Sequence, residues 1–274
     1  MQTQTEGQTS GRKSWNERWR IAGTALRGLA LLAGIAALVF PASAADENFH
    51  HTYPLAAGGS FALENVNGSV QVEGWSRDEV EVSAVKTARS DSRDLSQVKI
   101  EVDDSHPGQV AVHTRYPQGE GAEVAVEYHV HVPYRVLLGS IETVNGSVTV
   151  RGVEGGGELR SVNGNVEVFD SSGRFSEKTT NGNLRLELHQ LMAGGPMNLE
   201  TVNGSVVLGL PQGARADLKA LAMNGDIYSE LPVTSSASTP AARAFHAKLG
   251  TGGGEISVRT INGGIRLVVQ RPGV

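Results

Sequence analysis

Two small groups of residues in this chain have types and spacings that suit metal or acid–base chemistry. In the first group, Glu127, His129 and His131 alternate along one predicted strand, so their side chains share one face. Two imidazoles beside a carboxylate could bind Zn²⁺ or Cu²⁺. However, no fourth ligand can be named, and a polar strand face exposed to solvent would show the same spacing. The pair His50-His51 can likewise be read as metal ligands or as solvated side chains. We predict no metal and no cofactor.

The second group is acidic and basic. Asp170, Arg174, Arg185 and Glu187 would gather on one sheet, as in some parallel β-helix proteins that cleave polysaccharides. Their charges follow the repeat described below, and we expect no residue set to break that repeat as an added catalytic site would. The sequence also has no Gly-x-Ser-x-Gly, His-Glu-x-x-His or phosphate-loop motif. We predict a protein that is not an enzyme, with no catalytic residues; a carbohydrate-active or carbohydrate-binding protein is the alternative.

Aromatic residues and calcium ligands give little support to that alternative. Beyond the first 44 residues Trp75 is the only tryptophan. Four other aromatic residues are expected to fill the core or the corners: Tyr128, Phe169, Phe175 and Phe245. Calcium-binding β-rolls carry Gly-Gly-x-Gly-x-Asp repeats, whereas only Asp226 places a carboxylate beside a corner in this chain.

An Asn-Gly repeat predicts the corners and strands that would position these residues. The chain has seven Asn-Gly pairs, and the central ones follow one another at steps of 18, 18, 22 and 21 residues, a period typical of stacked coils. We predict that each pair forms a corner with positive φ, which glycine adopts without a Cβ penalty, while asparagine hydrogen-bonds its own backbone. The predicted corner residues are Asn67, Gly68, Asn145, Gly146, Asn163, Gly164, Asn181, Gly182, Asn203, Gly204, Asn224, Gly225, Asn262 and Gly263.

Short strands are expected on both sides of each corner. Residues three and five after the Asn are apolar, which is the period of a half-buried strand. The residue four before it is usually aliphatic (Leu63, Ile141, Leu159, Leu199), and the residue two before it is often Thr or Ser (Thr143, Ser161, Thr179, Thr201, Thr260). Because such a unit cannot bury its apolar face alone, we predict an all-β, single-domain parallel β-solenoid with coils of about 20 residues. Antiparallel β-hairpins are the alternative.

Stacking of coils would place equivalent residues in columns. In these columns opposite charges meet, and such exposed pairs contribute roughly 0.2–1 kcal/mol each, enough to favour one register. The predicted pairs are Glu142 with Arg160, Lys178 with Glu200, and Glu167 with Arg185.

Composition excludes several classes of protein. With 274 residues, 34 Gly and 19% charged residues, the chain suits a turn-rich β protein. It has no Cys and therefore no disulfide or thiolate metal site. The net charge is -5; residues 1–44 carry five basic against two acidic residues, so the remainder carries -8. An acidic chain of this kind argues against nucleic acid as a partner.

The N-terminus resembles an export signal. Residues 1–27 form a basic n-region, residues 28–40 a 13-residue apolar h-region, and cleavage is expected after Ala44. An uncleaved anchor is the alternative, and it would be the chain's only membrane contact. Residues 45–274 then form the solenoid domain in the periplasm or on the cell surface. Within it we expect degenerate coils at 61–138, regular coils at 139–274, and a Ser/Ala/Pro-rich loop insertion at about 232–243.

The valine-rich segment from His129 to Pro133, the aliphatic lead at Ile141 and the following Asn-Gly coils resemble the bacterial DUF4097 family, whose members are often labelled adhesins. The resemblance covers roughly residues 61–269 and implies an exported β-helix-like repeat domain with a binding or sensing role. It supplies no catalytic residues. We therefore predict a non-enzymatic cell-envelope protein with an adhesin-like binding or scaffold role, an envelope protein or glycan as partner, and a monomeric or weakly self-associating state.

Overall fold

The computed structural model describes residues 45–88, 93–117, 123–231, 233–239 and 244–270. The predicted signal peptide, residues 1–44, lies outside them. The one helix of the described part, α1 (Arg93–Gln97), has five residues, and no described helix is long and apolar enough to cross a membrane.

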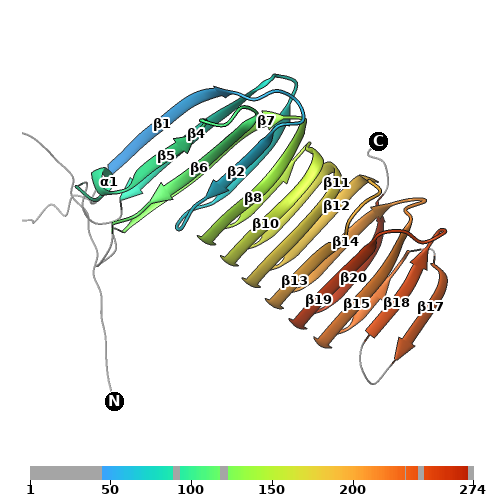
Figure 1. The fold of residues 1–274 in the computed structure, drawn as a ribbon. Helices are drawn as coiled ribbons and strands as arrows, with labels where there is room; N and C mark the ends of the chain where they lie inside the picture. The colour runs from blue at the N-terminus through green and yellow to red at the C-terminus, as the bar shows by residue number, and fades with distance from the viewer. Residues whose placement is uncertain (1–44, 89–92, 118–122, 232, 240–243, 271–274) are drawn as a thin grey trace, which may run out of the picture. The chain divides into compact units, whose positions relative to one another are not determined.

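The rest of the described chain is built almost entirely of β-strands (Figure 1). They are β1 (Ala45–Pro54), β2 (Ser60–Glu64), β3 (Val70–Trp75), β4 (Glu79–Ala88), β5 (Lys99–Asp103), β6 (Gln109–Arg115), β7 (Val124–Pro133), β8 (Arg135–Asn145), β9 (Val148–Arg151), β10 (Glu154–Asn163), β11 (Val166–Asn181), β12 (Leu184–Leu191), β13 (Met197–Asn203), β14 (Val206–Pro211), β15 (Ala216–Asn224), β16 (Ile227–Ser229), β17 (Val233–Thr239), β18 (Ala244–Leu249), β19 (Glu255–Asn262) and β20 (Ile265–Gln270).

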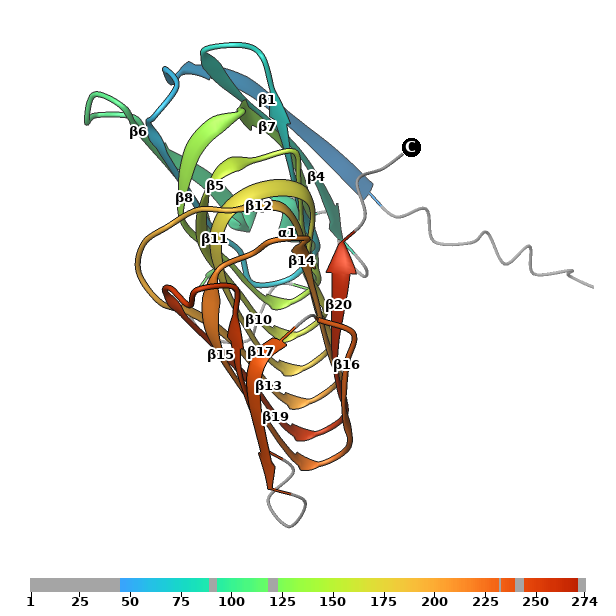
Figure 2. The ribbon, with the colours of Figure 1, turned by 90° about the vertical axis from the view of Figure 1, so that its right-hand side faces the viewer.

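These strands pair in two ladders. The first ladder runs β5-β6-β2-β8-β10-β11-β13-β19-β15-β18-β17. The second runs β1-β4-β7-β3-β9-β11-β12-β14-β20-β16. The long strand β11 belongs to both, because its first part pairs with β9 and its last part with β13. Every coil except β6–β7 thus crosses from one ladder to the other at an Asn-Gly pair, and Figure 2 shows the coils stacked behind one another.

The central coils stack in parallel and in register. Val148 pairs with Val166, Val166 with Leu184, and Leu184 with Val206, as the repeat predicted. The prediction of a solenoid-like all-β fold is confirmed, and antiparallel hairpins at these Asn-Gly pairs are the wrong alternative.

Two coils do not follow the order of the chain. The coil β2–β3 lies between β6–β7 and β8–β9, and the last coil, β19–β20, lies between β13–β14 and β15–β16. At the C-terminal end the reason is geometric: β18 pairs antiparallel with β15 and occupies its outer edge, so β19 pairs with the inner edge. The simple picture of coils added one after another is therefore incomplete at both ends.

Antiparallel strands close both ends of the stack, which the sequence did not predict. Strands β1 and β4 extend the second ladder beyond β7, and β5 extends the first beyond β6. The loop expected at about 232–243 is wrong for residues 233–239, which form β17 on the edge of β18. Backbone pairing with a free strand edge outweighed the loop-like composition, since strand formation depends strongly on context. These strands cover the outer edges of β7, β6 and β15, which would otherwise invite aggregation, whereas β16 is the last described strand of the second ladder at its end.

The core consists of the inward columns of both ladders. The predicted aliphatic column is buried at Leu63, Ile141, Leu159 and Leu199, and the Thr and Ser column beside it is buried as well. Tyr128 and Phe175 are fully buried, as expected of core fillers. One residue breaks the pattern: Glu177 lies in the aliphatic column between Leu159 and Leu199 and is 1% exposed. Glu177 is thus a single departure from the repeat, which sequence reasoning did not single out.

Candidate binding surface

The Asn-Gly corners form a continuous ladder of amides. Each asparagine donates from Nδ2 to Oδ1 of the next at 2.8–2.9 Å, and the six bonds all point the same way. In spatial order the ladder reads Asn224, Asn262, Asn203, Asn181, Asn163, Asn145, Asn67. Its regularity needs identical side chains one strand spacing apart, about 4.8 Å, as in stacked Asn ladders generally.

The corner glycines are required by packing rather than by positive φ. Only Gly68 and Gly263, with φ of 119° and 156°, have the left-handed conformation that the sequence predicted for every corner. At Gly164 an added Cβ would lie 2.0 Å from the carbonyl oxygen of Gly146, and the other corner glycines meet a neighbouring carbonyl in the same way. The buried hydroxyl two residues before each central corner donates to these carbonyls, as Ser161 does to Gly146 at 2.8 Å. The close approach of the coils therefore dictates glycine.

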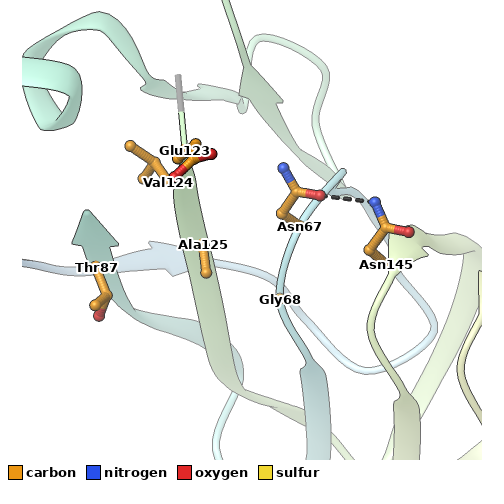
Figure 3. Close-up of a pocket in the computed structure, with 7 residues that line it drawn as sticks. All are labelled: Asn67, Gly68, Thr87, Glu123, Val124, Ala125 and Asn145. Atoms are coloured by element: carbon orange, nitrogen blue, oxygen red, sulfur yellow. Dashed lines mark hydrogen bonds between the residues drawn. The ribbon is translucent and has the colours of Figure 1, made fainter. Parts of the chain in front are cut away.

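The amide ladder ends at an open hollow of about 590 Å³ (Figure 3). Here β7 continues the stack, and Ala125 occupies the position that asparagine has in the coils beyond. Asn67 accepts the last ladder bond from Asn145, and its own amide nitrogen is directed away from that bond, towards the side of the hollow that Glu123 lines. The hollow thus offers an amide donor and a carboxylate, without a cluster of convergent groups that would indicate catalysis.

An asparagine inside the amide ladder should contribute more to the free energy of unfolding than an asparagine at its end. We expect Asn163→Ala to lower the free energy of unfolding by about 1–2 kcal/mol, because it removes two side-chain hydrogen bonds, and Asn224→Ala by about half of that, because it removes one. Urea unfolding curves of the two variants test this. Equal losses at both positions would show that the bonds do not act as a ladder.

Outside the core, two columns of the first ladder run beside these amides, and we call them the corner strip. The charged column contains Glu64, Glu142, Arg160, Lys178, Glu200 and Arg259. The apolar column, immediately before the asparagines, contains Val66, Val144, Val162, Thr180, Val202, Ile261 and Met223. Of these, Val144, Val162 and Met223 are exposed, and the other four are half-buried. These aliphatic side chains face solvent, so they cannot be explained as part of the core.

An open hollow of about 540 Å³ lies on the corner strip. Residues from five neighbouring strands, β6, β2, β8, β10 and β11, line it, among them Val66, Val144 and Val162. Charged side chains at its margin are paired along the stack: Arg160 lies 3.5 Å from Glu142, and Lys178 lies 3.2 Å from Glu200. Both of these pairs were predicted from the repeat. The third is not seen: Arg185 binds Glu187 of its own strand instead, with Nε 2.7 Å from Oε1.

The candidate metal ligands do not form a metal site. Glu127 and His129 project from the exposed face of β7, and His131 lies between Glu73, 3.7 Å away, and Glu81, 3.3 Å away. Among the residues that the structure describes, no three His, Asp or Glu side chains are grouped so that they could hold a metal ion. His50 pairs with Ser83 at 2.9 Å.

The acidic and basic group is only partly brought together. Asp170 contacts His189 at 3.3 Å and Arg151 at 3.8 Å on the second ladder, close to the pair of Arg185 and Glu187. Asp170 has φ of 48°, and the equivalent residue of the previous coil is a glycine with φ of 64°, so this conformation belongs to the bend of the coil. Arg174 lies elsewhere. It joins the residue after β12 to the start of β19 by donating to the backbone oxygens of Met192 and Glu255, and burial lowers the pKa of its guanidinium.

Two half-buried aromatic rings, those of Trp75 and Phe169, are in contact with the chain's own cationic side chains. The ring of Trp75 stacks on His131 at 4.9 Å, and the guanidinium of Arg77 lies 4.6 Å from the ring centre. Phe169 is approached by Arg151 at 4.5 Å and by Arg185 at 5.3 Å. Tyr134 and Tyr228, by contrast, are 48% and 55% exposed, and the guanidinium of Arg266 lies 5.7 Å from the ring centre of Tyr228.

Sequence reasoning missed the apolar column of the corner strip, although its signal was present. Val66, Val144, Val162, Val202 and Ile261 all precede the corner asparagine, at positions that alternation places outside the core. It also missed Glu177, whose position in the repeat could have been compared with the aliphatic residues of the other coils.

Comparison with known proteins identifies a matching family model and several similar solved structures. The family model described as Toastrack DUF4097 matches residues 51–268. A candidate cell adhesion protein from Clostridium sporogenes is 10% identical, with a TM-score of 0.44 over 81% of this chain and 100% of that one. A candidate adhesin from Bacteroides fragilis (9% identity, TM-score 0.36, 81% and 97% coverage) and a candidate lipid binding protein from Parabacteroides distasonis (8%, 0.24, 80% and 96%) are also similar. No curated protein matches the chain.

Proposed function

Since the chain belongs to the DUF4097 (Toastrack) family, we propose that it is a non-enzymatic, adhesin-like binding or scaffold protein of the cell envelope, and that it binds its partner through the corner strip. The exposed apolar column carries this proposal. Aliphatic side chains flanked by charges are the composition of a protein interface, with an apolar centre and a polar rim. The strip's two columns contain no aromatic residue, which favours a protein partner over a glycan.

The proposed location follows from the N-terminal sequence. The basic, apolar and Ala-rich segments of residues 1–44 support export to the periplasm or the cell surface. A rigid stack without disulfides suits that role, because the chain has no Cys and its coils are held by backbone pairing and by the amide ladder. Cell fractionation tests the location directly, and recovery of the intact chain in the cytoplasm would contradict it.

A single charge placed in the apolar column should abolish binding without affecting the fold. Val144 and Val85 are both 38% exposed, but only Val144 lies in the corner strip, whereas Val85 lies on β4. We expect Val144→Asp to lose the envelope protein that the wild type captures by cross-linking, because a carboxylate would be desolvated at the centre of the interface. Val85→Asp should retain it.

The melting temperature of both variants checks the fold. Capture that survives Val144→Asp contradicts the corner strip as the binding surface. If the wild type binds envelope glycans and no protein, the carbohydrate-binding alternative is supported instead. Release of reducing ends from such glycans by the wild type would contradict the non-enzymatic assignment.

A further inference from the structure

We infer that the corner strip binds a second copy of this chain, face to face, with the two stacks running in opposite directions. The inference rests on the proposed function, which makes the strip the binding surface, and it adds the identity of the partner. What supports it is the order of charges along the strip.

The charged column continues beyond the corner strip into β6 and β5. His113 pairs with Glu64 across β6 and β2, and Glu101 pairs with His113 across β5 and β6. All eight side chains are exposed or half-buried. From one end to the other the column reads Glu101, His113, Glu64, Glu142, Arg160, Lys178, Glu200, Arg259.

This order is complementary to its own reverse. A two-fold axis parallel to the strands, passing between β8 and β10, lays the column on the reversed column of a second copy, as a symmetric dimer requires. Every residue then meets an opposite charge or, at His113, a group that is cationic when protonated. The pairs are Glu142 with Arg160, Glu64 with Lys178, His113 with Glu200, and Glu101 with Arg259, and the symmetry makes each pair twice.

Other alignments of the same two faces bring like charges together. With the axis on β8, Glu142 faces its own copy, and with the axis on β10, Arg160 does. If the stacks ran in the same direction without a shift, every charge would face itself. Juxtaposed like charges disfavour such complexes, so the column selects one arrangement.

The apolar column fits the same arrangement. The axis between β8 and β10 places Val144 against Val162 of the second copy, and Val66 against Thr180. Both copies have the same strand spacing of about 4.8 Å, so neighbouring strands stay matched along the interface. The hollow over β6, β2, β8, β10 and β11 lies on this part of the strip, where it would face the same hollow of the second copy.

The most informative variants reverse charges that cannot touch within one chain. Glu64 and Lys178 lie on β2 and β11, with β8 and β10 between them, but they are paired in the dimer. Glu64→Lys alone and Lys178→Glu alone should each weaken self-association at least tenfold, because two pairs per dimer become repulsive. An equimolar mixture of the two variants should form a heterodimer, since both of its contacts are again attractive.

Sedimentation velocity and native mass spectrometry of the purified chains measure these states. We expect a wild-type dimer that dissociates as salt is raised, because exposed ion pairs are screened. Glu127→Lys, a charge reversal on the exposed face of β7, should leave the dimer unchanged. A wild type that stays monomeric at high concentration and low salt, single variants that still dimerise, or a mixture that forms no heterodimer would each overturn the inference. If, in that case, Val144→Asp still abolishes capture of a different envelope protein and Val85→Asp retains it, the proposed function stands and only the identification of the partner as a second copy is wrong.

Discussion

Gly164→Ala should be among the most destabilising single-methyl changes in this protein, with a loss of at least about 3 kcal/mol in the free energy of unfolding. The new Cβ would lie 2.0 Å from the carbonyl oxygen of Gly146 and 2.4 Å from its carbon, so two coils would have to separate. That carbonyl also accepts the hydroxyl of Ser161, and Gly164 donates its N–H to Asn181 at 3.0 Å. Urea unfolding measures the loss.

Two further variants separate this steric cause from the positive φ that the sequence suggested. Gly195→Ala is the matched control, because an added Cβ there meets nothing within 4 Å; its stability should change by less than about 0.5 kcal/mol or rise slightly. Asn tolerates positive φ better than Ala does. If Gly164→Asn were well tolerated while Gly164→Ala was not, backbone conformation rather than the approach of Gly146 would explain the corner.

Glu177→Leu should stabilise the protein by about 3–5 kcal/mol at pH 7, through removal of a buried unpaired polar group and restoration of the aliphatic column. Glu177 is 1% exposed, and neither carboxyl oxygen has a hydrogen-bond partner in the described part of the chain. Its neighbours in the column are Leu159 and Leu199. Burial, with a smaller contribution from the negative charge of Glu167, raises the pKa of Glu177 well above its usual value.

The raised pKa fixes the sign of the pH dependence. Above pH about 4.5 the unfolded chain releases the Glu177 proton while the folded chain keeps it, so the folded state binds more protons. Stability must therefore fall as the pH rises from the unfolded to the folded pKa, by up to about 1.4 kcal/mol per pH unit. Chemical denaturation of the wild type, Glu177→Gln and Glu177→Leu across this range tests the sign.

Both substitutions should remove this component of the pH dependence, because neither side chain titrates. Glu177→Gln keeps a buried polar group and should gain less stability than Glu177→Leu. Glu167→Gln, which removes only the neighbouring negative charge, should change the profile far less. Parallel stability profiles for the wild type and Glu177→Leu would show that Glu177 is not held neutral in the core.

The local repeat predicted much of the fold and part of the surface. Period-two alternation after each Asn correctly identified inward pairs such as Val148 and Val150, and the residue two before the Asn was correctly taken as a small inward position. The equal coil length correctly placed Glu142 beside Arg160 and Lys178 beside Glu200. Arg185 pairs with Glu187 and not, as predicted, with Glu167. Glu187 lies two positions away on the same face of the same strand, so it competes with Glu167 of the neighbouring coil for the guanidinium.

Within the regular coils, the sequence by itself determined which residues form strands, which face the core and which stack in columns, since alternation and a fixed coil length are local properties. Only the tertiary structure decided the order of the coils, the antiparallel strands at the ends, and the reason for glycine at the corners. Strand edges pair through backbone groups that every residue carries, so side chains do not specify that β19 lies between β13 and β15. Likewise, the distance from Gly164 to the carbonyl of Gly146 exists only once two coils, 18 residues apart, lie against each other.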